Sequence, residues 1–158
     1  MARATYLIGI GSNRRGRHGG PVAEVRAAIA ALDGVAAASP VMASAPLGPS
    51  LRRFANAAVL VDSALDPPAM LAAVKAIERD FGRRRGRRWG ARVIDLDLVL
   101  WSGGAWASPG LVIPHAAFRT RAFVLRPACA VAPGWRDPLT GRTVQQLAHA
   151  IDRRRPAA

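Results

Sequence analysis

Asp95 and Asp97 are the residues whose type and spacing point most directly to chemistry. They lie in the hydrophobic run 93–101, which predicts a β-strand. Alternate side chains of a strand share a face, so we expect both carboxylates on one face, with their Cα atoms about 6.5–7 Å apart. The opposite face would carry Ile94, Leu96, Leu98 and Leu100. Paired carboxylates repel each other unless a cation compensates, and such hard oxygen ligands suit Mg²⁺ that also binds phosphate oxygens.

Arginines crowd the ten positions immediately before this strand. They are Arg83, Arg84, Arg85, Arg87, Arg88 and Arg92. The planar guanidinium group grips phosphate oxygens at two points, so cations beside paired carboxylates fit a magnesium–triphosphate. Three alternatives stay open: an exposed acidic strand, a solvated basic loop, and a nucleic-acid contact in which Trp89 stacks on a base.

Four strands and two long helices should position these residues. Hydrophobic periodicity predicts strands at 5–10, 35–45, 54–61 and 93–101, helices at 21–32 and 67–81, and a last short helix at 143–151. The order βαββαβ indicates an α+β fold, a ferredoxin-like sandwich in which helices cover one face of an antiparallel sheet. The other face would be open to loops and ligand. We expect a single domain spanning 1–158.

Composition restricts the class of protein. The net charge of +13 comes almost entirely from arginine, since Lys75 is the only lysine, and it indicates an anionic partner only weakly. Cys129 stands alone, which excludes an internal disulfide. No apolar run reaches the roughly 18 residues of a membrane span, and the start resembles no signal peptide. We therefore expect a cytoplasmic protein with no membrane partner. A monomer is the default expectation, and we expect no nucleic-acid partner because Asp95 and Asp97 would repel a phosphate backbone unless metals intervened.

Gly9 and Gly11 follow the first strand in the manner of a dinucleotide-binding fingerprint. Arg14 replaces the third glycine, and the helix begins only near Pro21, so that pattern fails. We interpret the two glycines as permitting a tight turn at the sheet edge.

Taken together, these segments resemble the 6-hydroxymethyl-7,8-dihydropterin pyrophosphokinase family. The similarity is carried in order by the segments 6–13, 46–49, 54–58, 88–99, 113–115 and 121–123. The resemblance implies a ferredoxin-like fold and transfer of the pyrophosphoryl group of MgATP to the hydroxymethyl group of the pterin, with release of AMP. A palm-like nucleotidyl transferase, which would release pyrophosphate instead, remains a rival.

The resemblance also implies roles for individual residues. Asp95 and Asp97 correspond to the ligands of two Mg²⁺ ions, and Arg83 and Arg92 to catalytic arginines on the phosphates. The residues implied to bind ATP are Glu78, Arg85, Arg88, Trp89, Leu98, Val112, His115 and Arg121. The residues implied to bind the pterin are Ser44, Ala45, Leu47, Phe54, Asn56 and Phe123. Among these, Phe54 and Phe123 would stack on the two faces of the ring, and Asn56 would bond its edge.

Overall fold

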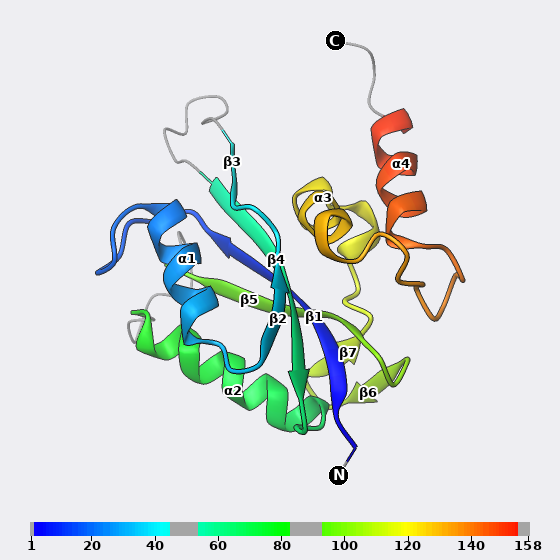
Figure 1. The fold of residues 1–158 in the computed structure, drawn as a ribbon, viewed down its shortest axis with the longest axis horizontal. Coiled ribbons are helices and arrows are strands. Elements are labelled where there is room, and N and C mark those ends of the chain that lie inside the picture. Colours follow the sequence, from blue (N-terminus) through cyan, green and yellow to red (C-terminus); the bar gives the residue numbers. More distant parts are fainter. Residues whose placement is uncertain (1, 45–53, 83–92, 155–158) are drawn as a thin grey trace.

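An antiparallel sheet forms the centre of the fold (Figure 1). The computed structural model describes residues 2–44, 54–82 and 93–154. The strands are β1 (Ala4–Ser12), β2 (Val35–Ala38), β3 (Met42–Ser44), β4 (Phe54–Ser63) and β5 (Asp95–Trp101). They lie in the order β2-β4-β1-β5, with β3 also paired to β4, and every pairing is antiparallel. This order and the succession of elements confirm the expected ferredoxin-like α+β fold.

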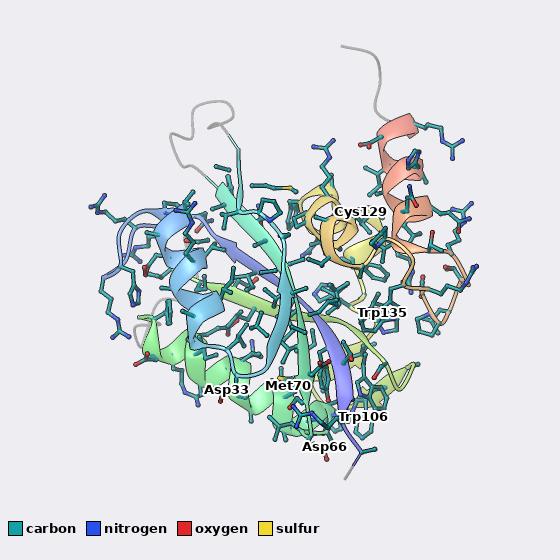
Figure 2. The ribbon with its side chains drawn as sticks, in the orientation of Figure 1. Asp33, Asp66, Met70, Trp106, Cys129 and Trp135 are labelled. Carbon is teal, nitrogen blue, oxygen red and sulfur yellow. The ribbon has the colours of Figure 1, made fainter. Side chains whose placement is uncertain are left out.

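Helices α1 (Pro21–Ala31) and α2 (Pro67–Asp80) cover one face of the sheet and enclose the main core. Both begin at the prolines that the sequence indicated, and the Asp66 carboxylate caps α2 by accepting a hydrogen bond from the Ala69 N–H at 3.0 Å. Met70, labelled in Figure 2, belongs to the apolar stripe that α2 turns towards the sheet. The main core includes Tyr6, Ile8, Ile10, Val25, Ala28, Val59, Met70, Val74, Leu96 and Leu98.

The opposite face was expected to be open, and this prediction is wrong for about half of it. Helices α3 (Ala122–Val131) and α4 (Val144–Arg154), with the short 3₁₀ helix η1 (Phe118–Thr120), pack there in a second core. The second core includes Leu7, Ala58, Val99, Leu100, Phe118, Leu125, Ala128, Val144 and Leu147. Cys129 and Trp135, labelled in Figure 2, lie partly buried against it. Helix α4 confirms the expected last helix, whereas α3 was not predicted.

A small hairpin, β6 (Trp106–Ser108) and β7 (Leu111–Ile113), follows the main sheet and was not predicted either. Within the described ranges 2–44, 54–82 and 93–154, no helix combines the length and the apolar character that crossing a bilayer requires.

A β-bulge changes the faces of β5. Its pairing with β1 shifts between Leu7 and Ile8, which oppose Leu100 and Leu98 respectively, so Val99 is the extra residue. An extra residue reverses the alternation of side chains. Leu96 and Leu98 therefore enter the main core as predicted, but Leu100 enters the second core with Val99. The prediction that Leu100 shares their face is wrong.

The expected strand 35–45 is divided into β2 and β3 at Ser39 and Pro40. Proline has no N–H to donate to a sheet. Ser39 compensates here, because its N–H donates to the Ala58 carbonyl at 2.8 Å and its hydroxyl accepts from the Ala58 N–H at 2.9 Å. The side chain thus replaces a bond of the backbone ladder where the strand is interrupted.

Asp137 holds the segment between α3 and α4 in place. Its buried carboxylate accepts hydrogen bonds from Arg119 Nη2 at 2.9 Å, from the Leu139 N–H at 3.0 Å and from the Thr140 hydroxyl at 2.8 Å. The Arg119 guanidinium group, which also donates through Nε, is the main reason that the pKa of Asp137 falls to about 2. Arg119 belongs to η1, so this pair ties η1 to the loop before α4.

We expect Asp137→Asn to lower the free energy of unfolding at neutral pH by about 2 kcal/mol, since it weakens several charge-assisted hydrogen bonds. The folded pKa of Asp137, about 2, lies below its unfolded value near 3.9, so its contribution is present above pH ~4 and disappears as the pH falls towards 2. Urea denaturation of both proteins across this range measures the difference.

Asp33→Asn is the matched control for that experiment. Asp33, labelled in Figure 2, is exposed in the turn after α1, so the same change of charge should barely alter stability. A difference between wild type and Asp137→Asn that stays constant down to pH ~2 would contradict the assignment to ionised Asp137.

Candidate active site

The acidic pair lies at the beginning of β5, on the face away from α1 and α2. Asp95 and Asp97 are half-buried, and the residue between them, Leu96, is buried in the main core. The two carboxylates therefore share a face, as the alternation predicted. Both occupy the part of the sheet that the second core leaves uncovered.

Strand β1 contributes two glycines, and therefore no side chains, beside the acidic pair. Gly9 lies opposite Asp97 on one side and Ala58 on the other, while Gly11 lies opposite Asp95 and Asn56. Residues directly opposite in antiparallel strands share a face, so Asn56, Gly11 and Asp95 form one row across three strands. The amide and the carboxylate are then separated by two strand spacings, about 9.5 Å, with no side chain between them.

Gly11 leaves room for the Asn56 side chain. A Cβ atom on Gly11 would lie 3.0 Å from the Asn56 Oδ1 atom and would crowd the amide. Gly9 and Gly11 both lie inside β1, and neither has a positive φ. The expectation that they form a turn at the sheet edge is therefore wrong: they keep the surface of the sheet free of side chains.

The surroundings of Asp97 favour a cation. Its pKa is raised first by burial and then by the neighbouring charge of Asp95. His115 and Arg121 act in the opposite direction, and the His115 Nε2 atom lies 3.8 Å from the Asp97 Oδ1 atom. A positive charge placed between the two carboxylates would relieve this repulsion.

His115 is held in one orientation. The backbone N–H of His115 donates a hydrogen bond to the Val99 carbonyl at 3.1 Å, which fixes the backbone beside β5. Its ring Nδ1 atom accepts a hydrogen bond from the Ala117 N–H at 3.2 Å. In the neutral ring the proton is then on Nε2, the atom that faces Asp97, so His115 presents a donor towards the acidic pair.

Two aromatic side chains are exposed on the same side of the sheet. Phe54 begins β4, two residues before Asn56, and is 40% exposed. Phe123 lies in the first turn of α3 and is 52% exposed. The Arg121 guanidinium carbon is 5.7 Å from the centre of the Phe123 ring. Large aromatic residues are usually buried, so this exposure suits a surface on which a flat ligand stacks.

Glu78 has a position that the sequence did not indicate. It was expected to line ATP, but its side chain is buried, and one carboxylate oxygen accepts a hydrogen bond from the Leu96 N–H at 2.9 Å. The other oxygen lies 3.2 Å from the Lys75 ammonium group. Burial is the main cause of its raised pKa, to which the charge of Asp95 also contributes. Glu78 thus anchors the backbone between the two aspartates to α2.

Of the remaining predicted site residues, three lie within the described ranges and the others lie outside them. Leu98 is buried in the main core, so its side chain does not reach the acidic face, whereas Val112 in β7 is exposed. Ser44 ends β3, where its backbone pairs with Phe54. Outside the described residues lie Ala45, Leu47, Arg83, Arg85, Arg88, Trp89 and Arg92.

Within the described part of the chain, no cluster of three or more His, Cys, Asp or Glu side chains could hold a metal ion. Asp95 and Asp97 supply carboxylate oxygens only, so a cation bound there would complete its coordination with water or with ligand oxygens. Mg²⁺ binds in this way in many phosphate-transfer sites, and the chemistry of the two carboxylates fits it.

We expect Glu78→Ala to loosen β5, because the Leu96 N–H loses its buried acceptor, which costs about 1–3 kcal/mol. Hydrogen exchange measured by NMR should show the Leu96 amide exchanging faster relative to amides of the β1–β4 ladder. Glu78→Gln keeps an oxygen acceptor and serves as the matched control. Unchanged protection of Leu96 in Glu78→Ala would show that the strand does not depend on this bond.

Comparison with known proteins agrees with this geometry. The family model described as 7,8-dihydro-6-hydroxymethylpterin-pyrophosphokinase matches residues 7–133. Three similar proteins are named 2-amino-4-hydroxy-6-hydroxymethyldihydropteridine pyrophosphokinase. The one from Synechocystis is 38% identical over 109 residues, with 69% of this chain and 56% of that protein covered. The one from Pseudomonas aeruginosa is 42% identical over 112 residues, with 70% and 68% covered. The one from Haemophilus influenzae is 33% identical over 134 residues, with 81% of each covered.

The chain therefore spans a little over half the length of the Synechocystis relative and 61% of a similarly named protein from Methylorubrum extorquens. Among solved structures, wild-type HPPK-DHPS of Plasmodium falciparum superposes with a TM-score of 0.72 at 13% identity, covering 94% of this chain and 41% of that one. At that identity the likeness shows the fold alone. The family match extends over most of the sequence, and on this basis the chain belongs to the 7,8-dihydro-6-hydroxymethylpterin-pyrophosphokinase family.

Proposed function

We propose that the protein transfers the pyrophosphoryl group of MgATP to the hydroxymethyl group of 6-hydroxymethyl-7,8-dihydropterin, as one pyrophosphokinase domain over 1–158. One observation carries this proposal: Asn56 and Asp95 flank Gly11 in a single row, so a site for a flat polar ring adjoins a site for metal-bound phosphate. The family membership supports it independently.

On one side of the row, the chain offers features suited to the pterin. The exposed rings of Phe54 and Phe123 supply stacking surfaces, and the Asn56 amide can both donate to and accept from the ring edge. Ala45 and Leu47, with Ser44, belong to the proposed pterin site through the family resemblance alone.

On the other side, Asp95 and Asp97 would hold two Mg²⁺ ions that arrive with ATP. Metal held by these two carboxylates would supply positive charge to the phosphates and help to align them for in-line displacement. His115 and Arg121 place a donor and a positive charge beside the same carboxylates. Arg83 and Arg92 would act on the phosphates, with Glu78, Arg85, Arg88, Trp89, Leu98 and Val112 assigned to nucleotide binding by the resemblance.

In the proposed reaction the pterin hydroxymethyl oxygen forms a bond to the β-phosphorus of ATP. The bond from that phosphorus to the oxygen bridging it to the α-phosphate breaks, AMP leaves with the oxygen, and the hydroxyl proton is released. The chain's contribution is to hold the acceptor oxygen and the phosphates side by side and to balance charge. We propose that the enzyme acts as a cytoplasmic monomer without a nucleic-acid or membrane partner.

The identity of the released nucleotide product tests this function. With ATP, Mg²⁺ and 6-hydroxymethyl-7,8-dihydropterin, we expect equal amounts of AMP and pterin pyrophosphate, resolved by chromatography and ³¹P NMR. Reactions without the pterin or without Mg²⁺ serve as controls. Release of pyrophosphate would instead support a nucleotidyl transferase, and release of neither product would overturn the proposal.

Asp97→Ala should reduce kcat for AMP formation by roughly a hundredfold or more, because the phosphates lose a carboxylate-bound cation in the transition state. The change removes a half-buried charge that burial and Asp95 already destabilise, so the thermal midpoint should not fall. Dihydropterin affinity, followed by fluorescence, should remain within about twofold of wild type. Turnover like that of wild type at ordinary Mg²⁺ concentration would refute the metal-binding assignment.

A further inference from the structure

The basic segment 14–20, between β1 and α1, packs around a buried acid of α1 that the proposed chemistry does not use. Glu24, in the first turn of α1, has a side chain with no exposed surface. Its Oε2 atom lies 2.9 Å from the His18 Nδ1 atom and accepts a hydrogen bond from the His18 N–H at 3.1 Å; its Oε1 atom lies 3.1 Å from the same ring nitrogen. Within the described ranges, no Arg or Lys forms an ion pair with Glu24. A buried polar side chain needs hydrogen-bond partners, and His18 supplies them through its backbone N–H and its ring nitrogen.

Segment 14–20 also packs against the end of α2. The His18 ring packs on the Phe81 ring with 4.7 Å between their centres. Arg17 bonds the Asp80 carboxylate at 2.8 Å, and its guanidinium carbon lies 5.8 Å from the centre of the Phe81 ring. Phe81 itself is buried in the main core. His18 therefore joins the first turn of α1 to the last residues of α2.

Segment 14–20 also presses against the start of β5. Gly16 and Gly19 exchange backbone hydrogen bonds at 2.9 and 3.2 Å, which closes the segment into a compact loop. A Cβ atom on Gly16 would lie 2.6 Å from a Val93 methyl carbon and would also collide with the Glu24 carboxylate. The loop backbone thus lies directly against both side chains. Val93 precedes Asp95 by two residues, and Gly11, which pairs with Asp95, lies three residues before Arg14.

These contacts converge on one part of the active site. Phe81 follows Glu78, which bonds the Leu96 N–H, and Val93 leads into Asp95. Loss of the His18–Glu24 contact would leave the Arg17–Asp80 bond in place but remove the link between the loop and the first turn of α1. Among the described contacts, its pairing with β1 and the Glu78 hydrogen bond would still hold the beginning of β5.

We propose that His18 and Glu24 are positioning residues for phosphoryl transfer: together they hold loop 14–20 against Phe81 and Val93, which fixes Asp95 relative to Asp97. Neither touches the reacting groups, and the proposal rests on the proposed function. It concerns the nucleotide half of the reaction, because Phe54 and Phe123 lie on β4 and α3 and are supported by other elements.

His18→Ala should lower kcat/KM for MgATP about tenfold, a smaller loss than the roughly hundredfold that a 1 Å misplacement can cause. The dissociation constant of the dihydropterin should change less than about twofold. His18→Asn places an amide N–H near the position of Nδ1 and should recover much of the loss. Glu24→Ala should reproduce the defect of His18→Ala, and the double variant should be no worse than either, since the two residues act as one unit.

A control variant in the second core distinguishes a loss of positioning from a general loss of stability. Leu147→Ala, on α4, truncates a buried side chain in the second core, which includes the end of β5 but not Asp95 or Asp97, and should lower the thermal midpoint without changing kcat/KM. If His18→Ala loses no more activity than Leu147→Ala at equal loss of stability, or if the His18 and Glu24 effects add, the proposal is overturned. Hydrogen exchange of the Asp95 amide provides a test independent of turnover: it should accelerate in His18→Ala and not in Leu147→Ala.

Different results would overturn the proposed function and the positioning role of His18 and Glu24. A wild type that forms no AMP overturns the function, and the exchange of the Asp95 amide still decides whether the pair positions the strand. A wild type that forms AMP, with His18→Ala matching it in both kinetics and exchange, overturns only the role of His18 and Glu24.

Discussion

The repulsion between Asp95 and Asp97 is the constraint around which the site is built. Two carboxylates on one strand face, half-buried together, are unfavourable by themselves, and the raised pKa of Asp97 records this. The fold can tolerate the pair only if the backbone beneath it is fixed independently of the carboxylates. Among the described strands, β5 pairs with β1 alone, and Glu78 supplies a hydrogen bond to Leu96 on its other side.

The side chains along β1 differ in size between the part of the sheet under α3 and α4 and the part beside the acidic pair. On the face away from α1 and α2, β1 presents Leu7, then Gly9, then Gly11. Leu7 contributes to the second core, under α3 and α4. The glycines leave a surface too bare to support a packed helix, and polar groups border it. The same strand thus divides one face of the sheet into a core half and a site half.

Much of the fold could be predicted because periodicity is strong where one face is buried. The helices starting at Pro21 and Pro67 and the strand carrying Asp95 follow directly from it. Helix α3 could not be predicted in this way, because Pro127 lies inside it and proline ordinarily ends a helix. Its apolar side chains, such as Leu125, are buried in the second core, so tertiary packing outweighs the local penalty there. The bulge at Val99 likewise depends on pairing with β1, which no local pattern reveals.

The candidate site was predictable to the extent that strand alternation fixes a face. Asp95 and Asp97 could be placed together, and Asn56 could be suspected because an amide among alanines needs partners. The supporting contacts could not be predicted, since Glu78 contacts Leu96, and His18 contacts Phe81, only after distant segments pack, and the local His18–Glu24 contact depends on the fold of loop 14–20. Sequence patterns identify groups that carry charge more readily than groups that hold the backbone still. Catalysis at such a site depends mainly on alignment, so the groups that hold the backbone in place determine how well the charged groups work.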